Sequence, residues 1–292
     1  MKFLVIGASG FVGRHLFKYV KSKGYEVVGT QSSSRQSGLV SFDLHKQRIK
    51  DRLDSTFIDE AQDIYAILCV KYGLMDQYAQ QCSTSREVEV ENMQVLIKDL
   101  ISVKIKPVYL STSYVFDGSD GSYTEDSKHS PISEYGRQKA EMENFISLSS
   151  HDILALRLDK IVGDNPTEDH LFSEWNQLVN QQKPIWCIKD QIFSPTYVED
   201  IAKGVIVACK ARLSGLFNFV NPESWLRRDL AREFVAQKGR HVDIISKDQS
   251  EFNFGDKRPL KTYLDPTGFI KLTGIRFTSM EEVISSFISK TV

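Results

Sequence analysis

A short apolar run followed by three spaced glycines constrains the fold of this chain most strongly. Residues 3–6 have the continuous apolar character of a central parallel strand, and an amphipathic helix follows to about Lys23. Between them, Gly7 allows a tight turn, Gly10 lets a phosphate approach the helix N-terminus, and Gly13 lets the helix pack closely on the strand. This order predicts a dinucleotide-binding turn. The residues expected to contact the dinucleotide here are Gly7, Ser9, Gly10, Phe11, Val12 and Gly13.

The residues after the second strand, predicted at 25–28, indicate which dinucleotide binds. A ribose without a 2′-phosphate is usually held by a carboxylate at this point, but segment 29–35 supplies hydroxyl groups and the cation of Arg35. These groups favour NADP(H), with NAD(H) as the alternative. In a second interpretation Arg35 belongs to a polar surface loop and points into water. The expected contacts in this region are Thr30, Ser32, Arg35, Asp43 and Leu44, with Asp43 accepting from the adenine amino group.

Further apolar runs alternate with helical patterns along the chain. A third strand is predicted at 40–42, and longer ones at 64–70, 108–111 and 153–158. A long, well buried helix is predicted at 85–103. Strands that alternate with helices in this way predict an α/β fold with a Rossmann-type, doubly wound parallel sheet.

The pattern becomes less regular after residue 158. Shorter strands and helices follow there, which predicts a smaller C-terminal α/β lobe. We therefore expect a dinucleotide-binding domain over 1–158, to which 190–220 returns, and a substrate-binding lobe over 159–292.

Tyr135 and Lys139 are four residues apart in a predicted helix, so they lie on one face, one turn apart. A cation beside a phenol favours the phenolate, which is expected to bring the pKa of Tyr135 from about 10 towards neutrality. Thr112 ends the strand at 108–111, at the sheet edge where ligands bind, and can direct its hydroxyl at the same atom. Together the three side chains can polarise a carbonyl. Taken alone, the spacing of Tyr135 and Lys139 also recurs by chance in purely structural helices.

Composition and charge exclude several classes of protein. The net charge of -1 over 292 residues gives no basic field for nucleic acid, and no apolar stretch is long enough for a membrane span. The four cysteines and six histidines are scattered, so we expect reduced thiols, no metal site and a cytoplasmic location. A small-molecule partner is the default.

With these motifs in place, the chain resembles the extended short-chain dehydrogenases, and most closely their dTDP-4-dehydrorhamnose reductase branch. The resemblance covers nearly the whole chain. Besides the glycine turn, the matching residues are Ser111, Thr112, Tyr114 to Gly118, Tyr123, Glu125, Pro131, Tyr135, Gly136, Lys139, Glu143, Ser194 to Tyr197, Arg258, Pro259, Leu264 and Asp265.

The resemblance implies an NADPH-dependent or NADH-dependent reductase of a nucleoside-diphosphate 4-keto-6-deoxy sugar. It implies that Tyr135 donates the proton, that Lys139 contacts the nicotinamide ribose and the tyrosine, and that Thr112 is their hydrogen-bond partner. Further cofactor contacts are expected at Val70, Lys71, Tyr72 and Leu110, and substrate contacts at Thr112, Ser113, Lys160 and Arg258.

Three positions depart from the pattern of that branch. Ser113 stands where the branch usually has Asp, Lys160 stands where it has Trp, and Lys71 puts a bulky cation where small residues touch the cofactor. We therefore expect retained reaction chemistry and a changed sugar pocket. Two alternatives stay open, an epimerase or dehydratase with the same three side chains and an NADP-binding regulatory subunit without turnover. The sequence does not fix the oligomeric state, and a homodimer is one assembly it allows.

Overall fold

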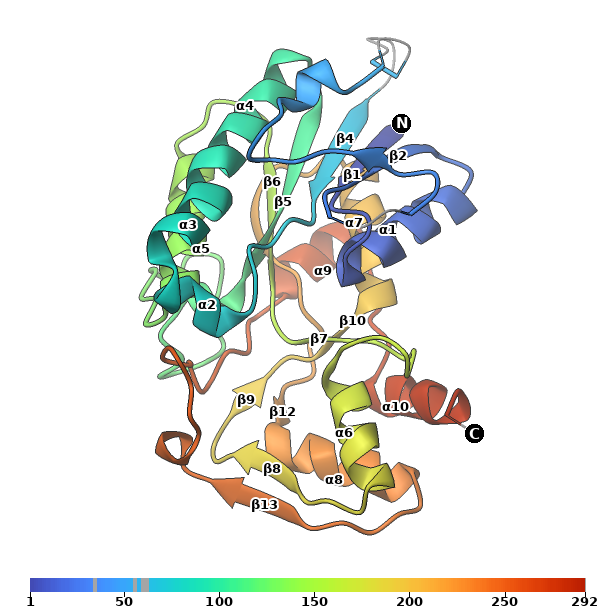
Figure 1. Cartoon of the computed structure of the whole chain (residues 1–292), viewed down its shortest axis with the longest axis vertical. Helices are drawn as coiled ribbons and strands as arrows, with labels where there is room; N and C mark the ends of the chain where they lie inside the picture. The colour runs from blue at the N-terminus through green and yellow to red at the C-terminus, as the bar shows by residue number, and fades with distance from the viewer. Residues whose placement is uncertain (34–35, 55–56, 59–62, 292) are drawn as a thin grey trace.

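Seven parallel strands form the central sheet of the computed structural model, which describes residues 1–33, 36–54, 57–58 and 63–291 (Figure 1). In spatial order they are β11 (Gly215–Asn218), β6 (Leu154–Leu158), β5 (Lys106–Thr112), β4 (Ile64–Leu68), β1 (Lys2–Ile6), β2 (Glu26–Gln31) and β3 (Val40–Ser41). Neighbouring strands of this sheet pair in parallel throughout the described residues. The predicted doubly wound Rossmann-type fold is therefore confirmed.

Helices cover both faces of the sheet, as Figure 1 shows. One face packs against α1 (Phe11–Ser22), α7 (Val198–Lys210) and α9 (Thr267–Thr273), and the other against α4 (Met93–Ser102) and α5 (Glu134–Ser147). Alternate residues of β1 enter the two cores, with Phe3 and Val5 on the α1 side and Leu4 and Ile6 on the α4 side. Burial on both sides explains why this strand reads as an unbroken apolar run.

The single helix predicted at 85–103 is interrupted in the structure. After the short helices α2 (Met75–Gln80) and α3 (Cys82–Arg86), a π-helical turn η2 (Glu87–Asn92) leads into α4. Three successive residues of this turn, Val88, Glu89 and Val90, are buried. A π turn inserts one extra residue and is frequent at functional sites. Here it brings a carboxylate into the interior.

The smaller lobe is built from short elements around an aromatic core. They are β7 (Ile161–Val162), α6 (Leu171–Asn180), β8 (Ile185–Ile188), β9 (Ile192–Phe193), β10 (Thr196–Tyr197), β12 (Trp225–Leu226), α8 (Arg227–Gln237), β13 (Ile244–Lys247) and α10 (Met280–Ser289). Short 3₁₀ turns lie elsewhere in the chain, at η1 (Ile49–Asp51), η3 (Ser113–Val115) and η4 (Gln249–Glu251). The rings of Phe172, Trp175, Phe234 and Phe287 pack together in its centre.

Segments from the second half of the chain contribute to both cores. β11 and α7 complete the large sheet and its cover, and Phe269 of α9 packs on Phe219 with ring centroids 4.6 Å apart. Helix α10 belongs to the core of the smaller lobe. The domain boundary at residue 158 therefore stays a prediction, with 198–218 and 267–277 packed on the large sheet.

Within the described residues, no helix has both the length and the apolar character needed to cross a bilayer. The same part of the chain holds no group of three or more His, Cys, Asp or Glu side chains arranged to bind a metal ion.

Candidate active site

The turn between β1 and α1 leaves room for a ligand that approaches the backbone. Gly7 has a φ of +85°, and a Cβ on Gly13 would lie 2.2 Å from the Gly7 carbonyl oxygen. A Cβ on Gly10 would meet its nearest protein atom only at 3.4 Å, so this glycine leaves space on the ligand side. The Gly7 backbone N–H donates to the Thr30 hydroxyl at 3.1 Å. Thr30 therefore stabilises the turn by accepting this hydrogen bond.

A cavity of about 480 Å³ opens beside this turn, beyond the carboxyl ends of β1, β2 and β4. In doubly wound sheets ligands bind at this edge. The predicted cofactor contacts that line the cavity are Gly7, Ser9, Gly10, Thr30, Ser32, Asp43, Leu44, Val70, Lys71 and Tyr72. The turn and the cavity fit a dinucleotide, with the pyrophosphate on the helix N-terminus.

Four other predicted cofactor contacts are not among the residues that line the cavity, and a fifth lies outside the described residues. Phe11 stacks on His170 with ring centroids 5.6 Å apart, and Val12 packs against the core below α1. Gly13 meets Gly7 directly, and the Leu110 carbonyl faces Lys139, as described below. Arg35 lies outside the described residues.

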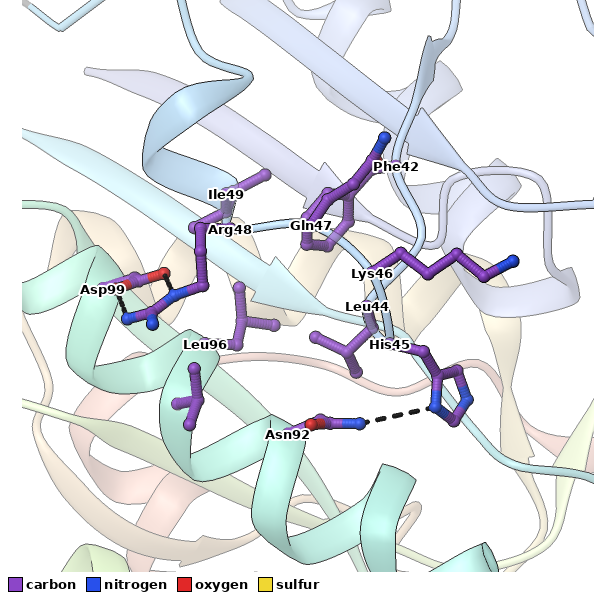
Figure 2. Close-up of a pocket in the computed structure, with 11 residues that line it drawn as sticks. Phe42, Leu44, His45, Lys46, Gln47, Arg48, Ile49, Asn92, Leu96 and Asp99 are labelled. Carbon is purple, nitrogen blue, oxygen red and sulfur yellow. Dashed lines mark hydrogen bonds and ion pairs between the residues drawn. The ribbon is translucent and has the colours of Figure 1, made fainter.

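The segment that carries Asp43 and Leu44 is anchored on α4. Arg48 donates from Nε to the buried Asp99 carboxylate at 2.6 Å, and Figure 2 shows this pair at one end of a smaller hollow of about 200 Å³. Asp43 accepts from the His45 backbone N–H at 3.0 Å. Burial alone would raise the pKa of Asp43, but that N–H and the Lys46 ammonium lower it. The anchored segment lines one side of the large cavity through Asp43, Leu44 and His45.

The structure brings Thr112, Tyr135 and Lys139 together at the end of β5. Ser133 caps α5 by accepting from the Gly136 N–H at 3.1 Å, so Tyr135 stands in the first turn of the helix. The Lys139 Nζ lies 5.9 Å from the centroid of the Tyr135 ring, and it lies 3.5 Å from the Leu110 carbonyl oxygen. The convergence inferred from helical spacing is thus present.

The predicted shift of the Tyr135 pKa towards neutrality is wrong, although Lys139 acts on this pKa in the predicted direction. Burial raises the pKa of Tyr135 above its ordinary value. Lys139 and the Thr112 hydroxyl lower this pKa, but the Glu89 carboxylate raises it again. Desolvation disfavours the phenolate more than the lysine favours it.

Glu89 is the residue that the sequence analysis missed in this centre. Its carboxylate is fully buried, and its Oε2 atom lies 2.9 Å from the Lys139 Nζ as a contact between charges rather than an aligned hydrogen bond. Burial alone would lower the pKa of Lys139, yet Glu89 holds it well above its ordinary value. In the sequence, Glu89 stands between the exposed Glu87 and Glu91, and no periodic signal separates the three.

The predicted substrate residue Ser113 is bonded to a second missed carboxylate. Its hydroxyl donates to Asp159 at 2.8 Å, and Asp159 also accepts from the Ser194 backbone N–H at 2.7 Å and the Thr262 hydroxyl at 3.1 Å. Burial raises the pKa of Asp159 to about 6. A carboxylate therefore lies beside Ser113 at the end of β6, where a polar residue after a buried strand was the available signal.

Cationic side chains gather beside this carboxylate. Lys160 is exposed, yet loss of hydration, with smaller contributions from Arg227 and Lys71, lowers its pKa to about 8. Arg258 is 11% exposed and pairs with Asp76, while its Nη1 atom has no hydrogen-bond partner among the described residues. This cluster suits an anionic ligand.

A buried network of ion pairs lies between β6 and α5, next to the candidate site. Arg157 and Glu143 are each 1% exposed, and they meet at 2.8 Å between β6 and α5. His129 contacts the same carboxylate at 2.7 Å, and Arg157 also reaches the carbonyl oxygens of Thr124 and Glu125. Burial alone would raise the pKa of Glu143, but His129 and Arg157 lower it. The network ties the connection 117–134 to the helix that carries the candidate catalytic residues.

Comparisons with known proteins bear on the whole chain. A dTDP-4-dehydrorhamnose reductase from Aggregatibacter actinomycetemcomitans is 27% identical over 299 residues, covering 98% of this chain and 97% of that protein. The methionine adenosyltransferase 2 subunit beta of Xenopus tropicalis is 25% identical over 212 residues, covering 72% of this chain and 62% of that protein. The crystal structure of a dTDP-4-dehydrorhamnose reductase from Bacillus anthracis in complex with NADP has a TM-score of 0.83 at 21% identity, covering 99% of this chain and 100% of that one.

The family model confirms the resemblance deduced from the motifs. It is described as the RmlD substrate binding domain, and it matches residues 1–292. The chain belongs to the RmlD substrate-binding family, whose named relatives include dTDP-4-dehydrorhamnose reductases.

Proposed function

We propose that the protein is an NADPH-dependent reductase of a nucleoside-diphosphate 4-keto-6-deoxy sugar. The observation that carries this proposal is the convergence of Thr112, Tyr135 and Lys139 beside a cavity of about 480 Å³ at the carboxyl edge of the sheet. Reductases among the relatives support the same reaction class.

The residues divide the work of carbonyl reduction. A bound reduced nicotinamide supplies a hydride to the carbonyl carbon. As that C–H bond forms, the carbonyl π electrons move onto the oxygen, and the Tyr135 O–H bond breaks to give the new alcohol its proton. Thr112 donates a hydrogen bond to the same oxygen. Lys139 holds the nicotinamide ribose and compensates the phenolate that remains on Tyr135.

The phosphate preference rests on the loop after β2. Thr30 bonds the Gly7 turn, so Ser32 and Ser33, which line the cavity, are the described hydroxyls left for a 2′-phosphate. Arg35 is assigned to that phosphate in our proposal. The Bacillus anthracis relative, whose structure contains NADP, supports NADP(H), and NAD(H) is the alternative.

The altered pocket points to a substrate other than the usual rhamnose precursor, or to a different nucleotide. Lys160 offers a cation in place of a flat aromatic surface, and it can pair with a diphosphate or with a carboxylate on the sugar. Asp159 beside Ser113 supplies an acceptor for a sugar hydroxyl. A cytoplasmic location and a homodimer belong to the same proposal.

A regulatory subunit is the second candidate function, because the Xenopus tropicalis relative is named as a subunit of another enzyme. The test is to incubate the protein with NADPH and a panel of nucleoside-diphosphate keto-sugars, and to follow absorbance at the nicotinamide band. Reduction of at least one member supports the proposal. Binding of NADPH, seen as a rise in melting temperature, without consumption by any member favours the regulatory role. An epimerase or dehydratase would convert the sugar with no net loss of NADPH.

A further inference from the structure

The buried carboxylate of Glu89 contacts one cation and two hydrogen-bond donors at the centre of the site. Its Oε2 atom lies 2.9 Å from the Lys139 Nζ, and its Oε1 atom accepts from the Tyr78 hydroxyl at 2.5 Å and the Tyr72 backbone N–H at 2.7 Å. Glu89 itself is 0% exposed. A carboxylate this deeply buried is tolerated as an ion only with such partners.

The position of Glu89 is fixed by helix geometry. It stands in the π-helical turn between α3 and α4, with buried neighbours on both sides. Tyr78 also packs edge-on against Tyr135, with ring centroids 5.0 Å apart, so the residue that holds Glu89 contacts the candidate proton donor as well. The carboxylate, the lysine and the phenol thus form one packed unit.

Two opposite charges, the Lys139 ammonium and the Glu89 carboxylate, act on the Tyr135 hydroxyl. Among the described residues, the ionisable side chains that act on Glu89 or respond to its charge are Tyr135 and Lys139 from α5, Tyr109 from β5, Tyr78 from α2 and Lys71 from the segment after β4. Of these, Lys139 and Lys71 are cations, and Arg258 acts on Lys71 from further out. Tyr72 contacts Glu89 through its backbone N–H. Interactions between buried charges are screened little by salt or water, so the charge of Glu89 opposes the effect of Lys139 on Tyr135.

We propose that Glu89 is a positioning residue that holds the Lys139 ammonium and keeps the proton on Tyr135, so that at neutral pH the site is set to give a proton away. The inference rests on the proposed function, because it takes Tyr135 and Lys139 as the groups that act on a carbonyl. In reduction the Tyr135 O–H bond breaks, and the substrate oxygen gains that proton while its carbon gains a hydride from the reduced nicotinamide. Oxidation of the alcohol needs the Tyr135 phenolate, which Glu89 disfavours.

The decisive substitution is Glu89→Gln, which keeps the shape of the side chain and an acceptor for Tyr78 but removes the charge. Glu91→Gln is the matched control, because Glu91 lies in the same π-helical turn with 63% of its side chain exposed. With ¹³C-labelled tyrosine, the Tyr135 signal is identified by its absence in Tyr135→Phe. We expect this signal to titrate at lower pH in Glu89→Gln than in the parent, and unchanged in Glu91→Gln.

The rates of alcohol oxidation and of carbonyl reduction should change with the pKa of Tyr135. At pH 7, NADP⁺-dependent oxidation of the product alcohol should rise in Glu89→Gln about tenfold for each unit by which the pKa of Tyr135 falls. The alkaline limb of the pH profile for reduction should move to lower pH by the same amount. Glu91→Gln should leave both profiles in place.

Failure of this inference is separable from failure of the proposed function. The Tyr135 titration needs no substrate, so it is readable even if no nucleotide sugar is reduced. Identical titration of Tyr135 in the parent and in Glu89→Gln overturns the inference. Glu89→Gln leaves Lys139 buried without a counter-charge, which can prevent folding. In that case the titration of Tyr135 in the parent protein is the test. Titration of its Tyr135 above the ordinary tyrosine pKa of about 10 supports the inference, and titration below that value overturns it.

Discussion

At the scale of single residues, the candidate site combines a phenol with a raised pKa, Tyr135, and an ammonium group with a lowered pKa, Lys160. Tyr135 is buried against Lys139 and Glu89, and that environment suits an acid better than a base. Lys160 lies where the surrounding protein makes its ammonium easy to deprotonate. Each of these two side chains gives a prediction.

Replacing Tyr135 by Phe should abolish most turnover while leaving the fold intact. The ring packs edge-on against Tyr78 and Tyr114, and phenylalanine preserves both contacts. Loss of a positioned acid is expected to lower kcat by about 10²- to 10⁴-fold. NADPH affinity, measured by fluorescence titration, should change little. A variant with turnover close to that of the parent would show that Tyr135 only fills space.

Substrate affinity should weaken as the pH rises through about 8, the pKa to which desolvation lowers Lys160. Below that pH the side chain is a cation and can pair with an anionic substrate group; above it the charge is lost. The predicted result is a KM that increases between pH 7 and pH 9 while kcat follows its own profile. Lys160→Arg should flatten this increase, because arginine stays charged. An increase of the same size in Lys160→Arg would assign the titration to another group.

At the scale of elements, the turn between β1 and α1 shows how two glycines serve different purposes. Gly13→Ala would place a Cβ 2.2 Å from the Gly7 carbonyl oxygen, so it should destabilise the fold by about 3 kcal/mol or more. Gly10→Ala has a nearest atom at 3.4 Å and an ordinary φ of -73°. It should cost at most about 1 kcal/mol but should weaken cofactor binding, since its methyl group faces the ligand.

Urea unfolding and NADPH titration of the two variants separate these effects. The expected pattern is a stability loss confined largely to Gly13→Ala, and an affinity loss in Gly10→Ala at nearly parental stability. Equal stability of both variants would mean that the turn can open to accept the methyl group of Gly13→Ala.

The large sheet could be predicted from the sequence because its strands are buried on both faces and read as apolar runs. Thr112, Tyr135 and Lys139 could also be predicted, because their positions follow from the end of a strand and the spacing of a helix. Glu89 could not, since its burial depends on Lys139 and Tyr78 from elements distant along the chain and on a π turn. The strands of the lobe are mostly two to four residues long, too short for a periodic signal.

At the scale of the whole molecule, a histidine links α1 to the segments around the smaller lobe. His15 lies 2.8 Å from Glu168 and 2.5 Å from Glu199, and Arg14 pairs with Glu168 at 2.9 Å. Burial alone would lower the pKa of His15, but the two carboxylates raise it. The link therefore joins elements on both sides of residue 158 by charge.

Stability should fall at high pH because of this link. The pKa of His15 in the folded protein is raised, so its stabilising contribution is fully present below the ordinary value of 6.5 and is lost as the pH rises through the folded pKa. Hydrogen bonds to charged groups contribute about 1.5 to 3 kcal/mol. Melting temperatures of the parent and His15→Gln should therefore differ most near pH 6 and converge at high pH. A constant difference across the range would show that His15 acts only by packing.

The central claim is that the three converging side chains complete a hydride transfer to a nucleotide sugar. The most direct measurement is single-turnover reaction with NADPH carrying deuterium at the transferable position, followed by mass spectrometry of the sugar. The account predicts that a keto-sugar from the panel gains one deuterium on the carbon that bore the carbonyl, in the parent protein and not in Tyr135→Phe. Tight binding of NADPH and of a nucleotide sugar together, with no deuterium in any sugar, would contradict it.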